Sequence, residues 1–343
     1  MVSIQPPAKI LFTGANGYFA SYAIKDLLKR GYQVVGTVRS AAKGEDLIKL
    51  HSEFGGQFNY AVVSDIAGAF DEVIKKGEFD AVAHAASPVA SGTTPDDYIR
   101  PAVDGTVGIL ASIKQYGPTV KRVVLTSSAL AAVQYQKGIV HTEAHWNEAV
   151  IKIVEQKGAN ASLGELYSAS KTYAEKAAWK FVSDNEGGIN FDLVAILPSY
   201  VRQAPIHPVT SRDQLTSTNM IFSTVRKPRP QSEWGNIAFH IVHAQDMAIL
   251  HSLAFSSTEA SGHRIFGIAA EPTWQNIYDA LNEDPAYPNV PQGEPGTGTN
   301  PDSGSSTWDV SLSKNLLGRD FVGIKQSFRE TEEYYRKKGW AFE

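Results

Sequence analysis

The first 200 residues alternate short apolar runs with longer amphipathic stretches, and no other feature of the sequence restricts the fold as strongly. Residues 81–86 and 123–125 are apolar or nearly so, which is typical of strands that are covered on both faces. Strands are expected at residues 9–12, 33–39, 58–65, 80–87, 121–128 and 191–197, with helices at 19–30, 42–54, 69–77, 97–117 and 167–185. This order of elements predicts a doubly wound parallel α/β sheet.

The alternation weakens after Pro198, where closely spaced prolines break the chain into short pieces. We therefore expect a main domain over residues 1–200 and a smaller substrate lobe over residues 201–343, from which some segments return to the main sheet. Residues 285–308 contain five prolines among Gly and Ser, and they predict a long exposed loop. The charged stretch 329–338 predicts a solvated surface helix.

The amino-acid composition excludes several classes of function. The 343 residues contain no cysteine, which excludes disulfides, thiolate nucleophiles and Cys-ligated metals, so redox chemistry would need a dissociable cofactor. The formal charge is −4 without a dense Lys/Arg block, which argues against nucleic-acid and anionic-membrane partners. The first residues lack a signal-peptide pattern, and no apolar run reaches about 18 residues. These features predict a soluble cytoplasmic protein, monomeric or homodimeric, that acts on a small molecule.

A glycine-containing segment joins the first expected strand to the first expected helix. Gly14 permits a tight turn, Gly17 lets the backbone approach a pyrophosphate, and Ala20 allows close helix packing. The helix N-terminus would face the anion. Three further residues of this turn are expected to contact the cofactor: Asn16, Tyr18 and Phe19. A G-x-x-G-x-x-A pattern alone also fits a plain strand-to-helix turn, but its place in the first βαβ unit favours a Rossmann-type dinucleotide site.

The end of the second expected strand indicates which dinucleotide is bound. An NAD site carries Asp or Glu there, whereas this chain has Arg39, followed by Lys43 one helical turn later. A guanidinium binds the oxygens of a 2′-phosphate bidentately, and a carboxylate would repel them. We therefore predict NADP(H); the alternative is that Arg39 is a solvated loop residue.

Tyr167 and Lys171 are four residues apart, which places both on one face of an expected helix. A nearby ammonium favours the phenolate and makes Tyr a usable acid or base near neutral pH. A second pair with this spacing, Tyr334 and Lys338, lies in the charged C-terminal stretch. Only Tyr167 lies between the fifth and sixth strands, and the fifth strand ends in the TSS run at residues 126–128. A hydroxyl at that strand end could donate to a substrate carbonyl oxygen.

Four motifs together resemble the extended short-chain dehydrogenases/reductases. They are Gly14-x-x-Gly17-x-x-Ala20, HAASP at residues 84–88, LTSS at residues 125–128 and Tyr167-x-x-x-Lys171. Within that family the chain resembles the dihydroflavonol reductase-like branch, and in particular the fungal and yeast NADPH-dependent aldehyde and ketone reductases; KTYAEKAAWK at residues 171–180 adds to that likeness.

The resemblance implies reduction of an aldehyde or ketone, with Tyr167 as proton donor, Lys171 beside it, and Ser128 rather than Ser127 as the catalytic hydroxyl. The cofactor contacts that it implies are Asp65, Ile66, Ala85, Ala86, Ser87, Thr126, Tyr167, Lys171, Pro198, Ser199 and Val201. Two other functions stay open: an epimerase or dehydratase that uses NAD(P) transiently, and a non-catalytic dinucleotide-sensing protein. Many relatives have a relay Asn where residues 103–106 read VDGT, so we assign no residue to that role.

Some residues are compatible with more than one interpretation. His240, His243 and Asp246 could suggest a metal site, but without a further ligand we interpret them as structural and predict no metal. Scattered apolar residues in the lobe either line a substrate pocket or form its core; they are Met220, Phe222, Trp234 and Phe239. Many relatives carry Gly-Pro where this chain has Arg202 to Pro205, which leaves the role of that segment open.

Overall fold

Seven parallel strands form one central sheet in the computed structural model, which describes residues 2–63, 70–87, 92–136, 138–236, 238–298 and 307–340. In chain order the strands are β1 (Lys9–Thr13), β2 (Gln33–Val38), β3 (Phe58–Val62), β4 (Ala81–His84), β5 (Arg122–Thr126), β7 (Asp192–Pro198) and β10 (Arg264–Gly267). Their order across the sheet is β10-β7-β5-β4-β1-β2-β3, and every pairing is parallel. The expected Rossmann-type α/β fold is confirmed. The seventh strand, β10, comes from residues 201–343, from which segments were expected to return to the sheet, although no strand was predicted at its position.

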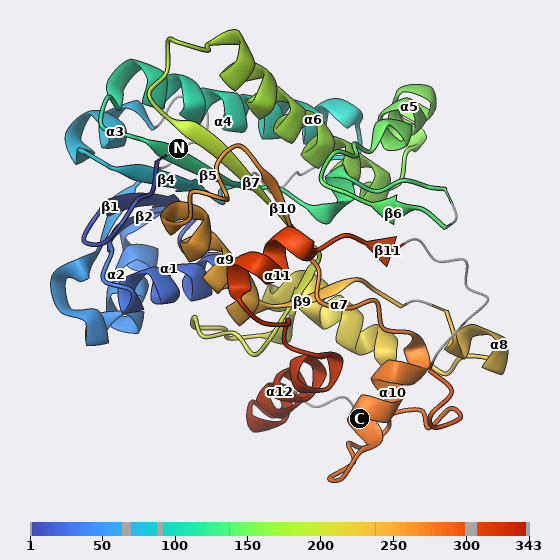
Figure 1. Cartoon of the computed structure of the whole chain (residues 1–343). Helices are drawn as coiled ribbons and strands as arrows, with labels where there is room; N and C mark the ends of the chain where they lie inside the picture. The colour runs from blue at the N-terminus through green and yellow to red at the C-terminus, as the bar shows by residue number, and fades with distance from the viewer. Residues whose placement is uncertain are drawn as a thin grey trace.

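Helices cover both faces of this sheet (Figure 1). One face carries α1 (Tyr18–Lys29), α2 (Ala41–Leu50), α9 (Ala244–Ser256) and α11 (Ser311–Leu317). The other carries α3 (Asp71–Gly77), α4 (Pro95–Tyr116) and α6 (Leu163–Asp184). Each face buries its own apolar cluster against the strands, which explains why the strands have continuous apolar runs instead of alternating ones.

A smaller group of elements lies beyond the carboxyl ends of the strands (Figure 1). It contains the short parallel pair β8 (Tyr200–Arg202) and β9 (Ile241–His243), with α7 (Thr216–Val225), α8 (Gln231–Trp234), α10 (Trp274–Asn282) and α12 (Ile324–Lys337). Alongside lie α5 (Glu148–Lys157) and the pair β6 (Val140–His141) and β11 (Thr307–Trp308). Four 3₁₀ turns complete the described elements: η1 (Ser52–Gln57), η2 (Ala129–Ala131), η3 (Gly158–Asn160) and η4 (Arg212–Leu215).

Two expectations about the C-terminal region were wrong in part. The charged stretch 329–338 is not simply solvated: α12 buries Phe328 and Tyr335 in the core of the lobe, and Thr331 and Glu332 are buried too. The exposed charged residues of the helix include Glu333, Arg336 and Lys337. The proline-rich segment is also anchored where it is described, since Tyr287 and Val290 are both buried. Residues 299–306 of that predicted loop lie outside the described part of the chain. Proline content signalled irregular backbone correctly but did not reveal which side chains would be buried.

The segment after β8 is held against helix α1. Arg202 is completely buried, with its guanidinium 4.6 Å from the Phe222 ring centroid and 4.7 Å from that of Phe328. The next two carbonyls, of Gln203 and Ala204, accept hydrogen bonds from the hydroxyls of Tyr18 and Tyr22 respectively. After β8 the chain thus has a buried cation between two aromatic rings, followed by two backbone carbonyls that accept hydrogen bonds from tyrosines.

No helix in the described ranges is both long enough and apolar enough to cross a membrane.

His251 couples the packing of α9 to pH. It is fully buried against Phe19, with Nδ1 2.8 Å from the Met247 carbonyl and Nε2 3.0 Å from the Thr126 hydroxyl. Burial lowers the pKa of His251 to about 4, from the usual value of 6.5. Between these two pH values the unfolded chain binds a proton that the folded protein does not, so stability falls as pH decreases below about 6.5.

We therefore expect the shifted pKa of His251 to lower the free energy of unfolding by about 2 kcal/mol when the pH falls from about 7.5 to about 5. His251→Gln should show a shallower loss of stability over this interval than the wild type, measured by urea unfolding at both pH values. His263→Gln, at an exposed position, is the control and should follow the wild type. Equal pH dependence of wild type and His251→Gln would contradict the assignment.

Candidate active site

The carboxyl ends of β1 and β4 form the crevice at which the strand order reverses, where open α/β sheets bind ligands. The Thr13 hydroxyl lies 2.9 Å from Nδ1 of His84 and accepts a hydrogen bond from the Ala86 backbone N–H at 3.1 Å. Gly14 has a φ of 69°, and a Cβ there would lie 2.9 Å from the Ala86 Cα. Only glycine fits this position, as the sequence pattern predicted.

The turn from β1 into α1 leaves backbone N–H groups without side-chain caps. Gly17 is the N-cap residue, and no side chain caps the helix start. The Tyr18 hydroxyl donates to the Gln203 carbonyl, and the Phe19 ring packs 4.4 Å from that of His251. Because both side chains are engaged elsewhere, any contact of these two residues with a phosphate would come from their backbone N–H groups. The Asn16 side chain is exposed in this turn.

The residues predicted to select the cofactor lie at the end of β2. Arg39 follows this strand directly, and Lys43 lies in the first turn of α2; both side chains are exposed. Ser40, the N-cap of α2, makes no side-chain cap, so this helix start also has open N–H groups. Asp65 and Ile66, two other predicted cofactor contacts, lie outside the described residues.

The remaining predicted cofactor residues follow the next strands along the same edge. Ala86 and Ser87 come just after β4, behind Ala85, and line one pocket together with Lys171. Ser199 is tied to β10, since both its N–H and its hydroxyl donate to the Gly267 carbonyl at 2.9 Å. Pro198 ends β7, and Val201 lies in β8. The Thr126 hydroxyl is paired with His251, which turns this side chain towards α9.

Tyr167 and Lys171 lie on α6, which begins at Leu163 and so starts four residues earlier than expected. A capping box formed by Ser162 and Glu165 begins the helix, which the sequence interpretation overlooked. The Lys171 Nζ lies 5.8 Å from the centre of the Tyr167 ring, and Tyr167 is 44% exposed. Tyr334 instead packs edge-on against Tyr335 and Trp340 in the C-terminal part of the chain.

The two serines that follow β5 have opposite hydrogen-bonding roles. Ser127 donates its hydroxyl proton to Oε2 of Glu175 at 2.6 Å. The Ser128 hydroxyl oxygen accepts from the Leu130 N–H at 3.2 Å, as the N-cap of η2. Ser128 therefore keeps its own proton for another acceptor, whereas the proton of Ser127 is already used.

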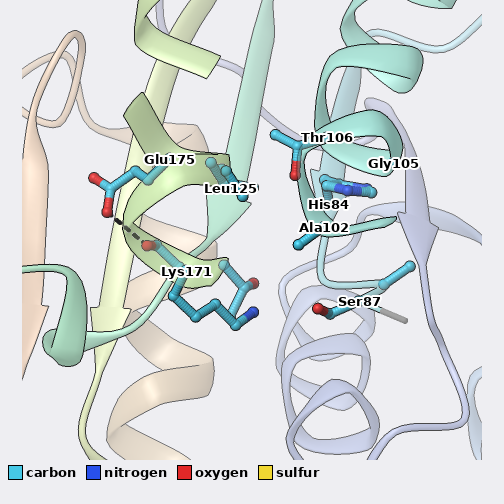
Figure 2. Close-up of a pocket in the computed structure, with 12 residues that line it drawn as sticks. His84, Ser87, Ala102, Gly105, Thr106, Leu125, Lys171 and Glu175 are labelled. Atoms are coloured by element: carbon cyan, nitrogen blue, oxygen red, sulfur yellow. Dashed lines mark hydrogen bonds between the residues drawn. The ribbon is translucent and has the colours of Figure 1, made fainter. Parts of the chain in front are cut away.

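A pocket lies between α4, α6 and the ends of β4 and β5 (Figure 2). It is lined by His84, Ala86, Ser87, Ala102, Gly105, Thr106, Leu125, Thr126, Ser127, Lys171, Ala174 and Glu175. Burial and the charge of Lys171 lower the pKa of His84 to about 3, so this histidine is neutral. Figure 2 shows the Lys171 amine extending towards Ser87, with Glu175 on the other side of the helix segment.

Three polar residues of this pocket were missed by sequence reasoning: His84 as a lining group, Thr106 and Glu175. Glu175 could have been found, because it continues the spacing of four from Tyr167 through Lys171. Thr106 lies on α4 within the segment to which no role was assigned. His84 was quoted only as part of a motif; its partner Thr13 is 71 residues away, which no local pattern reveals.

The three residues considered as metal ligands have other partners. His240 pairs with Glu271 at 2.9 Å, and His243 with Glu330 at 3.1 Å. Asp246 accepts from Arg319 at 2.6 Å and from the Val322 N–H at 2.7 Å. Within the described ranges, no three His, Asp or Glu side chains gather as a metal site.

Comparisons with known proteins point to one family. Residues 10–269 match the model of the NAD dependent epimerase/dehydratase family. The chain is 34% identical over 339 residues to an NADPH-dependent methylglyoxal reductase of Saccharomyces cerevisiae, covering 94% of this chain and 96% of that protein. It is 32% identical over 338 residues to Aldehyde reductase 2 of Sporidiobolus salmonicolor, covering 94% of each.

A solved structure shows the same fold. The crystal structure of Gre2 from Candida albicans in complex with NADPH superimposes with a TM-score of 0.84 at 32% identity, covering 97% of this chain and 99% of that one. The match of the family model over most of the chain, together with 34% identity to the yeast reductase over 94% of it, identifies the chain as a member of the NAD-dependent epimerase/dehydratase family, the extended short-chain dehydrogenases/reductases.

Proposed function

We propose that this protein uses NADPH to reduce an aldehyde or ketone to an alcohol. The observation that carries the proposal is that α6, which has an exposed tyrosine beside a lysine, packs against η2, whose N-cap Ser128 donates its proton in no described hydrogen bond. Bound NADPH supplies the hydride. Ser128 donates a hydrogen bond to the carbonyl oxygen, and Tyr167 delivers the proton to it. The Lys171 charge stabilises the phenolate that remains on Tyr167.

Relatives of known name support this proposal. Two of those compared above are named as an NADPH-dependent methylglyoxal reductase and an aldehyde reductase, and a third relative, from Aspergillus niger, as a ketoreductase. The family also contains epimerases and dehydratases, which return the cofactor unchanged. Net oxidation of NADPH in the presence of a carbonyl compound distinguishes a reductase from these enzymes and from a protein that only senses the dinucleotide. A screen of aldehydes, ketones and ketoesters is therefore the first experiment.

An aromatic surface next to Tyr167 favours substrates with an apolar substituent. Burial and the proximity of Tyr167 raise the pKa of Tyr200, which keeps it neutral. The Tyr200 ring lies edge-on to Phe239 at 5.8 Å, and Phe239 lies edge-on to Trp274 at 5.1 Å. Phe222, the other phenylalanine considered for the pocket, is completely buried in the lobe core. We expect turnover to increase with the apolar size of the carbonyl substituent.

The cytoplasmic location and the monomeric or homodimeric state stay predictions of the sequence. Size-exclusion chromatography with light scattering tests the second.

We expect Tyr167→Phe to abolish reduction and to leave NADPH binding largely intact, because the change removes a transferable proton and little contact area. Tyr334→Phe is the matched control: it shares the spacing to a lysine but lies on α12, and it should keep full activity. Steady-state NADPH oxidation and NADPH fluorescence titration measure the two effects. Similar activity in both variants would disprove the assignment of the proton donor.

Ser128→Ala should lower turnover about 10²-fold or more, the scale for the loss of one oxyanion donor. Ser127→Ala should cost less, because the Ser127 proton is directed to Glu175. The comparison requires kcat for both variants with one substrate. The reverse ranking would move the catalytic hydroxyl to Ser127.

Arg39→Asp should raise the KM for NADPH at least about tenfold and narrow or invert the preference over NADH, since one charge-assisted contact is worth about 1.5–3 kcal/mol. Lys49→Asp changes the same charge at the other end of α2 and should alter neither constant. Higher salt should weaken NADPH binding more than NADH binding, because only the phosphate contact is screened. An unchanged KM in Arg39→Asp would mean that Arg39 is a solvated loop residue.

A further inference from the structure

Glu175 is a buried carboxylate in the wall of the pocket, and the proposed mechanism does not use it. It lies on α6 four residues after Lys171 and eight after Tyr167, and its side chain is fully buried. A buried carboxylate is costly unless it is paired and its oxygens accept hydrogen bonds. Its position among the reacting side chains therefore calls for a physical role.

Four hydrogen bonds converge on this carboxylate from three directions. Ser127 donates at 2.6 Å, and the Trp179 indole N–H at 3.3 Å. Arg264 donates through Nε at 2.6 Å and through a terminal nitrogen at 3.3 Å. Both carboxylate oxygens are thus satisfied, and the charge is balanced by a guanidinium that is itself 7% exposed.

Arg264 extends the connection beyond α6. It lies in β10, and its other terminal nitrogen donates to the carbonyls of Glu143 at 2.8 Å and His145 at 2.5 Å. Its guanidinium lies 3.8 Å from the centre of the Trp146 ring. The Glu175–Arg264 pair therefore joins α6, the edge strand β10 and the segment 143–146, none of which are neighbours in sequence.

Ser127 connects the same pair to the end of β5. Its backbone N–H donates to the Ile196 carbonyl at 2.8 Å, so the residue is held by backbone and side chain alike. The next residue, Ser128, begins η2. The orientation of this turn decides where the Ser128 hydroxyl lies relative to α6, which carries Tyr167 and Lys171. The dashed line at Glu175 in Figure 2 marks the hydrogen bond from Ser127, which connects the turn after β5 to α6.

We propose that Glu175 is a positioning residue: through Ser127 and Arg264 it holds the turn after β5 against α6 and so places the Ser128 hydroxyl for the substrate carbonyl. This inference rests on the proposed reduction. It assigns no contact between Glu175 and the substrate or cofactor. Catalytic groups must be held close to their productive geometry, and a shift of about 1 Å can cost about 10²-fold in rate.

The primary test compares two buried Arg–Glu pairs of this chain. Glu175→Gln removes the charge from the pair in the pocket wall. Glu332→Gln does the same to the Arg226–Glu332 pair in the lobe, whose nitrogen–oxygen distance is 2.7 Å and whose side chains are 8% and 1% exposed. Both variants should lose thermal stability. Only Glu175→Gln should lose kcat, by about tenfold to a hundredfold, with the NADPH dissociation constant unchanged. Equal kcat in the two variants would overturn the proposal.

A double-mutant cycle tests whether the effect passes through Ser128. In a Ser128→Ala background there is no hydroxyl left to place, so Glu175→Gln should cost little further activity. The full single-mutant loss in that background would show that Glu175 acts by another route and would reject the proposal. If Glu175→Gln does not fold, Ser127→Ala takes its place in the cycle, because it removes only the hydrogen bond.

Wild type and Tyr167→Phe in the same assay separate this proposal from the proposed function. If the wild type reduces no carbonyl compound, or Tyr167→Phe stays active, the proposed function fails. If Tyr167→Phe is inactive and Glu175→Gln has the kcat of Glu332→Gln, the proposed function stands and only the positioning role of Glu175 fails.

Discussion

The approach of β1 to β4 at Gly14 is the constraint on which the site depends, since a β-carbon there would lie 2.9 Å from the Ala86 Cα. Parallel pairing of these strands brings Thr13 beside His84, and the Thr13 hydroxyl then holds both the His84 ring and the Ala86 backbone. The turn into α1 and the segment after β4 take their places from this contact. The crevice between them is the space that a dinucleotide needs.

The side chains proposed to act in catalysis lie on tightly packed elements. Helix α6 packs along α4 and against η2 and α5. It buries Leu166 and Ala169 in the cluster shared with α5, and Ala178 in the cluster shared with α4. Each fully buried apolar side chain of the larger kind contributes about 1.5–3 kcal/mol. Tyr167 is the exception, because its ring must reach a ligand and therefore stays partly exposed. Rigid support and one accessible phenol are what proton transfer at a defined atom requires.

Two ion pairs connect strands of the sheet to neighbouring elements. At the amino end of β5, Arg122 is completely buried and donates to both oxygens of Asp192 on β7, at 2.7 and 2.6 Å. The same guanidinium donates to carbonyls at the end of α9, including that of Ser257 at 2.7 Å. In the second pair, Glu175 on α6 accepts from Arg264, the first residue of the edge strand β10. Hydrogen bonds of defined geometry set the register between elements more strictly than apolar contacts, which tolerate small displacements.

Local sequence patterns determined much of the fold and part of the candidate site. The apolar runs predicted six of the seven central strands, and the glycine spacing predicted the turn at the crevice, because strand burial and backbone conformation depend on a few neighbouring residues. The spacing of four likewise placed Tyr167 and Lys171 on one helix face. Only the tertiary structure decided that β10 is the strand that joins the sheet, that α12 buries Phe328, and that Arg202 lies between two aromatic rings. The same is true of the two serines: Ser127 donates its proton to Glu175, whereas the Ser128 hydroxyl accepts and keeps its own proton. Each of these depends on a partner distant in the chain, and no local period encodes which distant residue will be the partner.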